Sequence, residues 1–276
     1  VSQADNVFTI TPSSTEADEG TFSITFNVTD GVNASVSTVS AFTLAFWSGD
    51  IANASYDSVS FSINSQDATP YGIAFNPDGT KMYMVGNSTD SFYQYSLSTG
   101  FDLSTASYDS VSFSVTSQDA APKDIAFNPT GTKMYMVGAN VQSVHQYSLS
   151  TGFDLSTASY DSVSFSVTGQ DSGSSGIAFN PTGTKMYMLG WVYGAVHQYS
   201  LSTGFDLSTA SYDSVSFSVT GQDTGPYGIE FNPDGTKMYV MGTSSGSVHQ
   251  YSLSTGFDLS TASYDSVSFS VTGQDT

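Results

Sequence analysis

The chain of 276 residues contains no cysteine, which excludes disulfide bonds, a thiol nucleophile and metal sites with cysteine ligands. It has no run of about 18 apolar residues, the length that a membrane-spanning helix needs. Cations are scarce too: five lysines face 25 acidic residues, and the formal net charge is −20. Because binding to nucleic acid needs clustered positive charge, a nucleic-acid partner is not expected. Membrane insertion is not expected either, because the long apolar run is missing.

Short motifs of enzyme active sites are also scarce. The metal-binding pattern HExxH and the phosphate-binding P-loop do not occur. The histidines His145, His197 and His249 all occupy the same position of a repeated unit. A histidine that recurs in successive copies packs a structure more often than it catalyses a reaction, so no catalytic residue is singled out.

What the sequence does contain is a period of 52 residues. The string ASYDSVSFS and the string FNP-[DT]-GTKMY both recur at this spacing. Each unit holds four runs with the alternation of β-strands and no helical periodicity. In the first complete unit the runs are residues 72–76, 81–86, 91–98 and 108–115, here labelled strands A, B, C and D. Four antiparallel strands repeated every 40–50 residues or so are typical of a β-propeller blade.

We therefore predict an all-β fold made of four-stranded antiparallel β-propeller blades preceded by Ig-like strands. The four predicted blades are residues 71–116, 123–168, 175–220 and 227–272. An extra outer strand of type D is predicted at residues 55–63. This strand either closes the ring against a terminal blade or belongs to a blade that the chain lacks.

The first 49 residues follow a different pattern. Alternating apolar residues predict strands at 21–29 and 39–46, with a turn at 30–35 between them and a further strand at 7–11. So few strands form too small a core to fold independently. We therefore predict that residues 1–49 are the end of an Ig-like β-domain or a linker, and that residues 50–276 are the repeat domain.

Two resemblances extend this interpretation. The string IAFNPDGTKMYMVG, residues 73–86, resembles the hairpin of YVTN-type propeller repeats. The longer unit YQYSLSTGFDLSTASYDSVSFS is similar to repeats in large surface and virion structural proteins of marine bacteria and their phages. The N-terminal segment FSITFNVTDGVNASVSTVSAFTLAF resembles the Ig-like segments that precede those repeats. The resemblance implies an exported or virion-borne protein of structural or attachment type, similar to a tail fibre.

Comparison of the copies within the chain separates constant segments from variable ones. The A–B turns and C–D connections hardly differ, whereas the B–C loops and the links from strand D to the next strand A vary freely. In an up-and-down sheet both variable windows leave the blade at the same end, so we expect them on one face. The residues predicted there to bind a ligand or partner are Trp191, Tyr193, Tyr71, Tyr227, Lys123, Asn140 and Gln142.

Carboxylates supply a second candidate site. Asp67, Asp119, Asp171 and Asp223 recur just before strand A, and Glu230 stands where the other copies have alanine. A ring of carboxylates could hold Ca²⁺ through oxygen ligands. The alternative is that each aspartate caps the turn between strands D and A. No other cofactor is expected.

These observations favour a protein that is not an enzyme. We expect a structural or attachment protein on a virion or cell surface, outside the cell. It would bind a surface glycan or a protein through the variable face and form a homo-oligomer or a larger assembly. Two alternatives stay open: a scaffold whose variable face packs on sister subunits, and a metal-dependent propeller hydrolase of the lactonase type. The hydrolase would need several non-equivalent metal ligands, and only Glu230 is identified as one.

Overall fold

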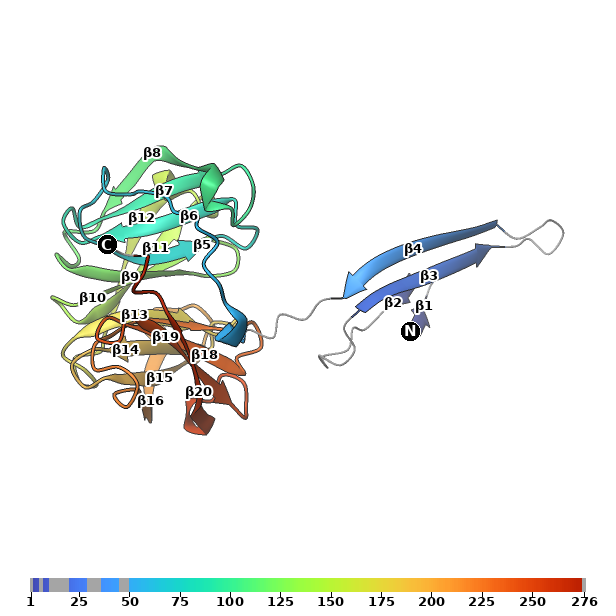
Figure 1. Cartoon of the computed structure of the whole chain (residues 1–276). Coiled ribbons are helices and arrows are strands. Elements are labelled where there is room, and N and C mark those ends of the chain that lie inside the picture. Colours follow the sequence, from blue (N-terminus) through green and yellow to red (C-terminus); the bar gives the residue numbers. More distant parts are fainter. Residues whose placement is uncertain (1, 5–6, 10–19, 29–35, 45–49, 275–276) are drawn as a thin grey trace. The chain divides into compact units, whose positions relative to one another are not determined.

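The computed structural model describes residues 2–4, 7–9, 20–28, 36–44 and 50–274. Within them the fold is all-β, with antiparallel strands and short 3-10 turns, as the sequence predicts (Figure 1). The chain divides into two compact units, residues 1–50 and 51–276. The described part contains no helix that is long and apolar enough to cross a membrane.

Within its described residues the first unit contains two antiparallel strand pairs. Strand β1 (Ser2–Ala4) pairs with β2 (Val7–Thr9), and β3 (Gly20–Val28) pairs with β4 (Val36–Leu44). The longer strands overlap the predicted ones. The predicted turn at residues 30–35 lies outside the described residues, and the Ig-like assignment stays a prediction.

The second unit contains the four predicted blades, each a sheet in the order A–B–C–D. The first blade comprises β5 (Pro70–Phe75), β6 (Lys81–Gly86), β7 (Ser91–Leu97) and β8 (Ala106–Ser114). The second comprises β9 (Pro122–Phe127), β10 (Lys133–Gly138), β11 (Ser143–Leu149) and β12 (Ala158–Ser166). The third comprises β13 (Ser174–Phe179), β14 (Lys185–Gly190), β15 (Ala195–Leu201) and β16 (Ala210–Ser218). The fourth comprises β17 (Pro226–Phe231), β18 (Lys237–Gly242), β19 (Ser247–Leu253) and β20 (Ala262–Ser270).

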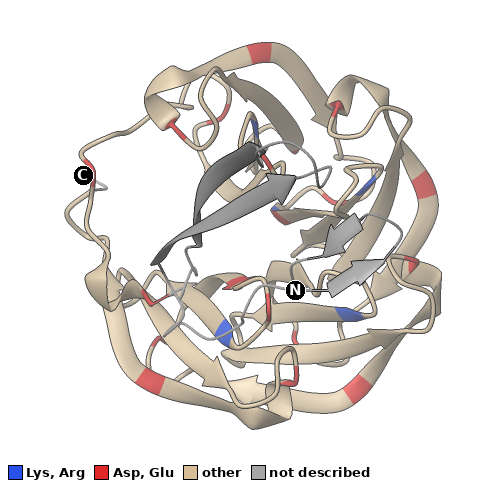
Figure 2. Cartoon of the chain, turned by 90° about the vertical axis from the view of Figure 1, so that its right-hand side faces the viewer, with Lys and Arg blue, Asp and Glu red and all other residues tan. Residues whose placement is uncertain are grey.

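The blades stand around a common centre (Figure 2). Their A strands are innermost: β9 contacts both β5 and β13, and β13 contacts β17. Each D strand follows a 3-10 turn; these turns are η3 (Leu103–Thr105), η4 (Leu155–Thr157), η5 (Leu207–Thr209) and η6 (Leu259–Thr261). The arrangement confirms the predicted propeller fold and brings residues of the D–A links and of the A strands towards the centre.

Each interface between consecutive blades repeats the same bonds. Between the first and second blades, the Tyr83 hydroxyl donates to the carbonyl oxygen of Phe153 at 2.5 Å. The backbone N–H of Leu155 donates to Oε1 of Gln94 at 2.8 Å. The equivalent pairs in the next two interfaces are Tyr135–Phe205, Leu207–Gln146, Tyr187–Phe257 and Leu259–Gln198. A buried apolar cluster accompanies each interface, so burial and hydrogen bonding together fix the angle between blades.

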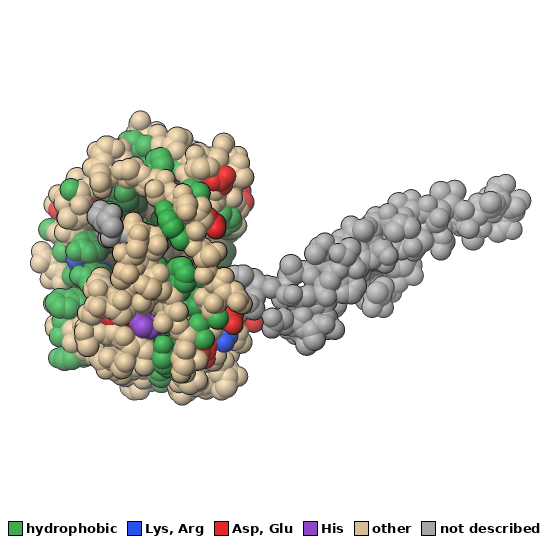
Figure 3. Space-filling model, viewed as in Figure 1, with side chains coloured by type: hydrophobic (Ala, Val, Ile, Leu, Met, Phe, Trp, Pro, Cys, Tyr) green, Lys and Arg blue, Asp and Glu red, His purple; other side chains and the backbone are tan. Residues whose placement is uncertain are grey.

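Four lysines form ion pairs within the blades. Lys81 Nζ lies 2.7 Å from Asp109 Oδ2, joining the start of strand B to strand D of its own blade. The pairs Lys133–Asp161, Lys185–Asp213 and Lys237–Asp265 repeat this contact at 2.6–2.8 Å. Lysine side chains (blue) are correspondingly few on the surface shown in Figure 3. Four of the five lysines are therefore structural.

The leading segment, residues 51–63, joins the fourth blade to the first (Figure 1, blue). It begins with the 3-10 turn η2 (Ile51–Asn53), whose Ile51 N–H donates to Gln250 Oε1 at 2.8 Å. Further along, the Phe61 ring makes an edge contact with Tyr95 of the first blade, with centroids 5.6 Å apart. The predicted strand at residues 55–63 is wrong, because no ladder forms there. Every other D strand pairs with strand C of its own blade, and the described chain supplies no strand C for this segment.

Candidate functional site

The two variable windows lie together, as expected, because one aspartate in each blade joins them. Asp67 accepts hydrogen bonds from the backbone N–H of Thr69 in the D–A link and of Thr89 in the B–C loop, at 2.7 and 2.9 Å. Asp171 does the same with Gly173 and Tyr193, both at 2.8 Å. These bonds place B–C loops and D–A links on one face.

The same bonds favour the capping alternative for the aspartates. The side chains of Asp67, Asp119, Asp171 and Asp223 are at most 3% exposed. Each carboxylate is occupied by N–H donors of its own two loops. Among the described residues no three His, Asp or Glu side chains are grouped as metal ligands. The calcium ring that the sequence left open therefore has no geometric support.

The variable B–C loops differ in what they present. Trp191 and Tyr193 are 42% and 65% exposed, and the indole of Trp191 lies so close to Gly173 that a Cβ there would collide with it. In the second blade, the Asn140 N–H donates to Asp119, and Gln142 Nε2 donates to the Ser172 carbonyl at 2.8 Å. Asn140 and Gln142 thus take part in holding the loops, whereas the two aromatic rings of the third blade are free to be reached from solvent.

Three other predicted binding residues meet between the D–A links of different blades. Tyr71 and Tyr227 stack with ring centroids 5.5 Å apart and planes at 9°. Lys123 Nζ lies 3.7 Å from the centroid of Tyr71 and 6.0 Å from that of Tyr227. Its ammonium also reaches Asn87 Oδ1 at 3.4 Å. An ammonium over stacked tyrosines gives one spot with both a positive charge and an aromatic surface.

Asp124, the residue after Lys123, was not singled out by the sequence analysis. It lies on the innermost strand β9, and its carboxylate accepts the N–H groups of Ile125 and Ile177, both at 2.9 Å. Burial, together with a smaller effect of the negative charge of Glu230, raises the pKa of Asp124 to about 7. The N–H donors oppose this rise but do not overcome it. A carboxyl group that titrates near neutral pH can exchange protons with a substrate or water.

Glu230 occupies the corresponding strand of the fourth blade, β17. Its side chain is open to solvent, yet the surrounding protein excludes enough water to raise its pKa. The negative charge of Glu230 contributes to the raised pKa of Asp124. We refer to Tyr71, Lys123, Asp124, Tyr227 and Glu230 as the central cluster.

A signal for Asp124 was present in the sequence. The equivalent positions in the other copies are Gly72, Gly176 and Gly228, so Asp124 is a single-copy departure from a glycine, just as Glu230 departs from alanine. Gly72 in fact faces Asp124, because a Cβ on Gly72 would lie 2.3 Å from Asp124 Oδ1. The Asp124 carboxylate therefore occupies the space that a side chain at Gly72 would take.

The three histidines lie away from this cluster, within the blades. His249 is 6% exposed; its Nε2 lies 3.0 Å from Ser245 Oγ and its ring contacts Tyr264. Burial lowers the pKa of His249, and that of His145 and His197. These side chains are therefore neutral packing residues at pH 7.

The histidines should make the fold sensitive to acid. Because burial lowers their folded pKa, stability is retained above the ordinary value of 6.5 and is lost as the pH falls below it. The first copy has Tyr93 here, whose hydroxyl reaches Thr89 at 2.9 Å, and Ser245 takes the place of Thr89 in the fourth copy. We expect the melting temperature of His249→Tyr to fall less between pH 7.5 and 5 than that of wild type. Equal falls in a fluorescence melt would contradict the assigned role.

Comparisons with known proteins bear on the role of the central cluster. A family model described as "Lactonase, 7-bladed beta-propeller" matches residues 62–256. A comparison with curated proteins returns no match.

Several solved structures are similar in fold. A proposed 6-phosphogluconolactonase from Bacteroides uniformis is 16% identical, with a TM-score of 0.49, over 74% of this chain and 56% of that chain. The periplasmic gluconolactonase of Pseudomonas aeruginosa is 13% identical, with a TM-score of 0.41, over 67% and 50%. These likenesses are too low to argue for a function. The chain spans little more than half the length of the first of these proteins.

The family match corrects two expectations from the sequence. The expectation of a structural or attachment protein, and the expectation that the chain is not an enzyme, are both contradicted, because the matched family is one of lactonases. The alternative of a lactonase-type propeller is the one that the match supports. The sequence interpretation gave more weight to the recurring segments than to the single-copy carboxylates Asp124 and Glu230.

Proposed function

Because the chain belongs to the family of lactonases with a seven-bladed β-propeller, we propose that it hydrolyses lactones at the centre of its ring. The observation that carries the proposal is the pair of carboxyl groups on innermost strands, Asp124 and Glu230, both with raised pKa. Each replaces a small residue of the repeat. Carboxyl groups with perturbed pKa values on the innermost strands are typical of active sites.

The reaction needs a base that works near neutral pH. A lactone is a cyclic ester, and hydrolysis adds water across the bond between its carbonyl carbon and ring oxygen. Asp124, with a pKa of about 7, takes a proton from the water as the water oxygen attacks the carbonyl carbon. The N–H groups of Ile125 and Ile177 hold the carboxylate in place for this step.

The second carboxyl group supplies the proton that the departing oxygen needs. When the ring carbon–oxygen bond breaks, the former ring oxygen becomes a hydroxyl group by taking a proton from Glu230. Asp124 then returns the proton of the water to Glu230 through solvent, and the product is the open-chain hydroxy acid. Two carboxyl groups that sense each other share protons in this way, so their pKa values belong to the pair.

Substrate binding falls to the other members of the central cluster. The stacked rings of Tyr71 and Tyr227 offer a flat surface for the C–H face of a sugar lactone. The ammonium of Lys123 can attract an anionic group of the substrate, in a chain whose net charge of −20 otherwise repels anions. A polyhydroxylated lactone with one negative charge fits this combination.

The metal in the original hydrolase alternative does not fit the residues described. No three possible ligands are grouped among them, and Asp124 already accepts two N–H donors. We therefore derive no step through a metal ion. The YVTN-type repeat and the Ig-like start of the chain remain proposals that rest on sequence strings such as residues 73–86.

The proposal is tested by measuring the hydrolysis of a six-membered sugar lactone. The acid that hydrolysis releases is detected with a pH indicator in weak buffer. Wild type is compared with Asp124→Gly, a change to the residue that the other copies have at this position. Acid release above the spontaneous rate by wild type, and its loss in the variant, is the expected result. Equal rates with and without the protein for charged and neutral lactones would overturn the proposal.

A further inference from the structure

The interface between the fourth and first blades is incomplete. Ile73 on the first blade is 55% exposed, whereas the equivalent Ile125, Ile177 and Ile229 are 2–6% exposed. Met241 on the fourth blade is 43% exposed, although its equivalents Val85, Val137 and Leu189 are fully buried. We refer to the surface between Ile73 and Met241 as the wedge.

The leading segment already fills one part of the wedge. The bond from Ile51 to Gln250 is equivalent to the bond from Leu155 to Gln94, which joins the η4 turn of the second blade to the first blade. The leading segment therefore contacts the fourth blade in the way that each blade's 3-10 turn contacts the preceding blade. Phe61 contacts Tyr95 as Phe113 contacts Tyr147, with centroids 5.6 and 5.7 Å apart. Both ends of the segment therefore make the contacts of a strand D in a fifth blade position.

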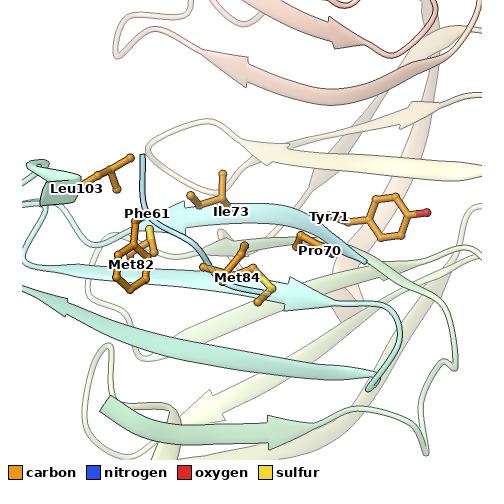
Figure 4. A pocket seen from close by; sticks show the side chains of 8 residues that line it. Phe61, Pro70, Tyr71, Ile73, Met82, Met84 and Leu103 are labelled. Atoms are coloured by element: carbon orange, nitrogen blue, oxygen red, sulfur yellow. The ribbon is translucent and has the colours of Figure 1, made fainter. Parts of the chain in front are cut away.

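Strands A, B and C of this fifth position are absent among the described residues. An apolar hollow of about 220 Å³ lies between the first blade and the leading segment, on the side that those strands would cover. Figure 4 shows the Phe61, Ile73, Met82, Met84 and Leu103 side chains around it. Leu103 is only half-buried, while its equivalents Leu155, Leu207 and Leu259 are 1% exposed. At the other three interfaces, strands A to C of the preceding blade bury the equivalent side chains. Within the described chain the first blade lacks these strands.

We propose that the wedge binds a three-stranded A–B–C unit of this same repeat, with residues 54–63 as its strand D. The incoming strand C would pair with the leading segment, as β7 pairs with β8. Its glutamine would accept the Leu103 N–H, and its strand B tyrosine would donate to the Phe101 carbonyl, as Gln94 and Tyr83 do one blade further on. Unpaired strand edges and exposed apolar surface both favour such an addition.

The absence of cysteine allows a direct test. Single substitutions Ile73→Cys and Met241→Cys give the chain one thiol each, in the wedge, and both positions are exposed enough to tolerate the change. Labelling by a thiol reagent is measured with the A–B–C unit supplied in two ways. A copy of residues 225–257 is appended after Thr276, or the same sequence is added as a separate peptide.

The proposal predicts that labelling at both positions slows about tenfold or more in at least one arrangement, because a buried thiol reacts only during local opening. Tyr193→Cys, exposed on a loop of the third blade, should label at an unchanged rate, and Ile125→Cys gives the rate of a buried thiol. Unchanged labelling in both arrangements overturns the proposal. Protection without the added unit, accompanied by a dimer in light scattering, also overturns it, because a second copy then fills the wedge.

Discussion

The Asp124→Gly variant should hydrolyse a sugar lactone about 100-fold or more slowly than wild type, the usual loss when a general base is removed. Glycine is the residue of the other three copies at this position, so the blade should fold as they do. The value of kcat should carry the loss, because Tyr71, Tyr227 and Lys123 still bind the substrate. Initial rates over a range of lactone concentrations separate kcat from KM.

The pH dependence identifies the group. Asp124 must lose its proton to act as a base, so kcat/KM of wild type should rise as the pH rises through the pKa of about 7, and should fall again once Glu230 loses the proton that it donates. The residual activity of the variant should lack this rise. A variant with unchanged kcat, or one that keeps the same pH profile, would assign the base to another residue.

The same substitution has a predictable effect on stability. The folded pKa of Asp124, about 7, lies above its ordinary value of 3.8, so the folded state holds the proton more tightly than the unfolded state. This contribution to stability is therefore present at low pH and is lost as the pH rises from about 4 to 7. Asp124→Gly should remove that part of the decline, which urea unfolding at pH 5 and pH 8 measures. Matching declines would show that Asp124 is ionised throughout.

Asp171→Ala should lower the free energy of unfolding by about 3 kcal/mol or more, because hydrogen bonds to charged groups contribute about 1.5–3 kcal/mol each. The Asp171 side chain is fully buried and accepts the N–H groups of Gly173 and Tyr193, both at 2.8 Å. Its loss leaves both donors unpaired and opens a void against Gly190. Urea unfolding monitored by tryptophan fluorescence gives the difference in the free energy of unfolding between the variant and wild type.

A matched control uses an aspartate in the same blade. Asp206 caps the η5 turn and accepts the Ser208 N–H at 3.1 Å, at an exposed site. Asp206→Ala should cost about 1 kcal/mol, as caps exposed to water do. Equal costs for the two variants would mean that burial of the Asp171 carboxylate adds nothing to its role.

The sequence predicted the blades well because their signal is local and repeated. Strand B was predicted at residues 81–86 and observed at Lys81–Gly86, between a Gly-containing turn and a variable loop. For Asp67 and its equivalents the sequence left a calcium ring and a turn cap open. The structure favours the cap, because an aspartate before a turn has a local use that does not depend on the rest of the fold.

Two errors came from information that is not local. Residues 55–63 have the same alternation as every strand D, but a strand needs a partner, and pairing depends on the rest of the blade. Asp124 has an ordinary local sequence; its pKa follows from burial at the centre and from Glu230, more than 100 residues away. Only a search for single departures from the repeat could have found it.

The repeated interface bonds have a consequence for how the chain folds. Each blade contacts the next through identical residues, such as Tyr83 with Phe153 and Tyr135 with Phe205. A chain assembled with its units displaced by one whole copy would form almost the same bonds, so the energy gap between correct and displaced assemblies is narrow. The departures from the repeat, among them Asp124 and the paired rings of Tyr71 and Tyr227, are what distinguish one copy from another. Residues that serve chemistry at the centre thus also specify the correct order of the blades. Refolding from denaturant is expected to pass through kinetic traps, and substitution of these residues should make the traps longer-lived.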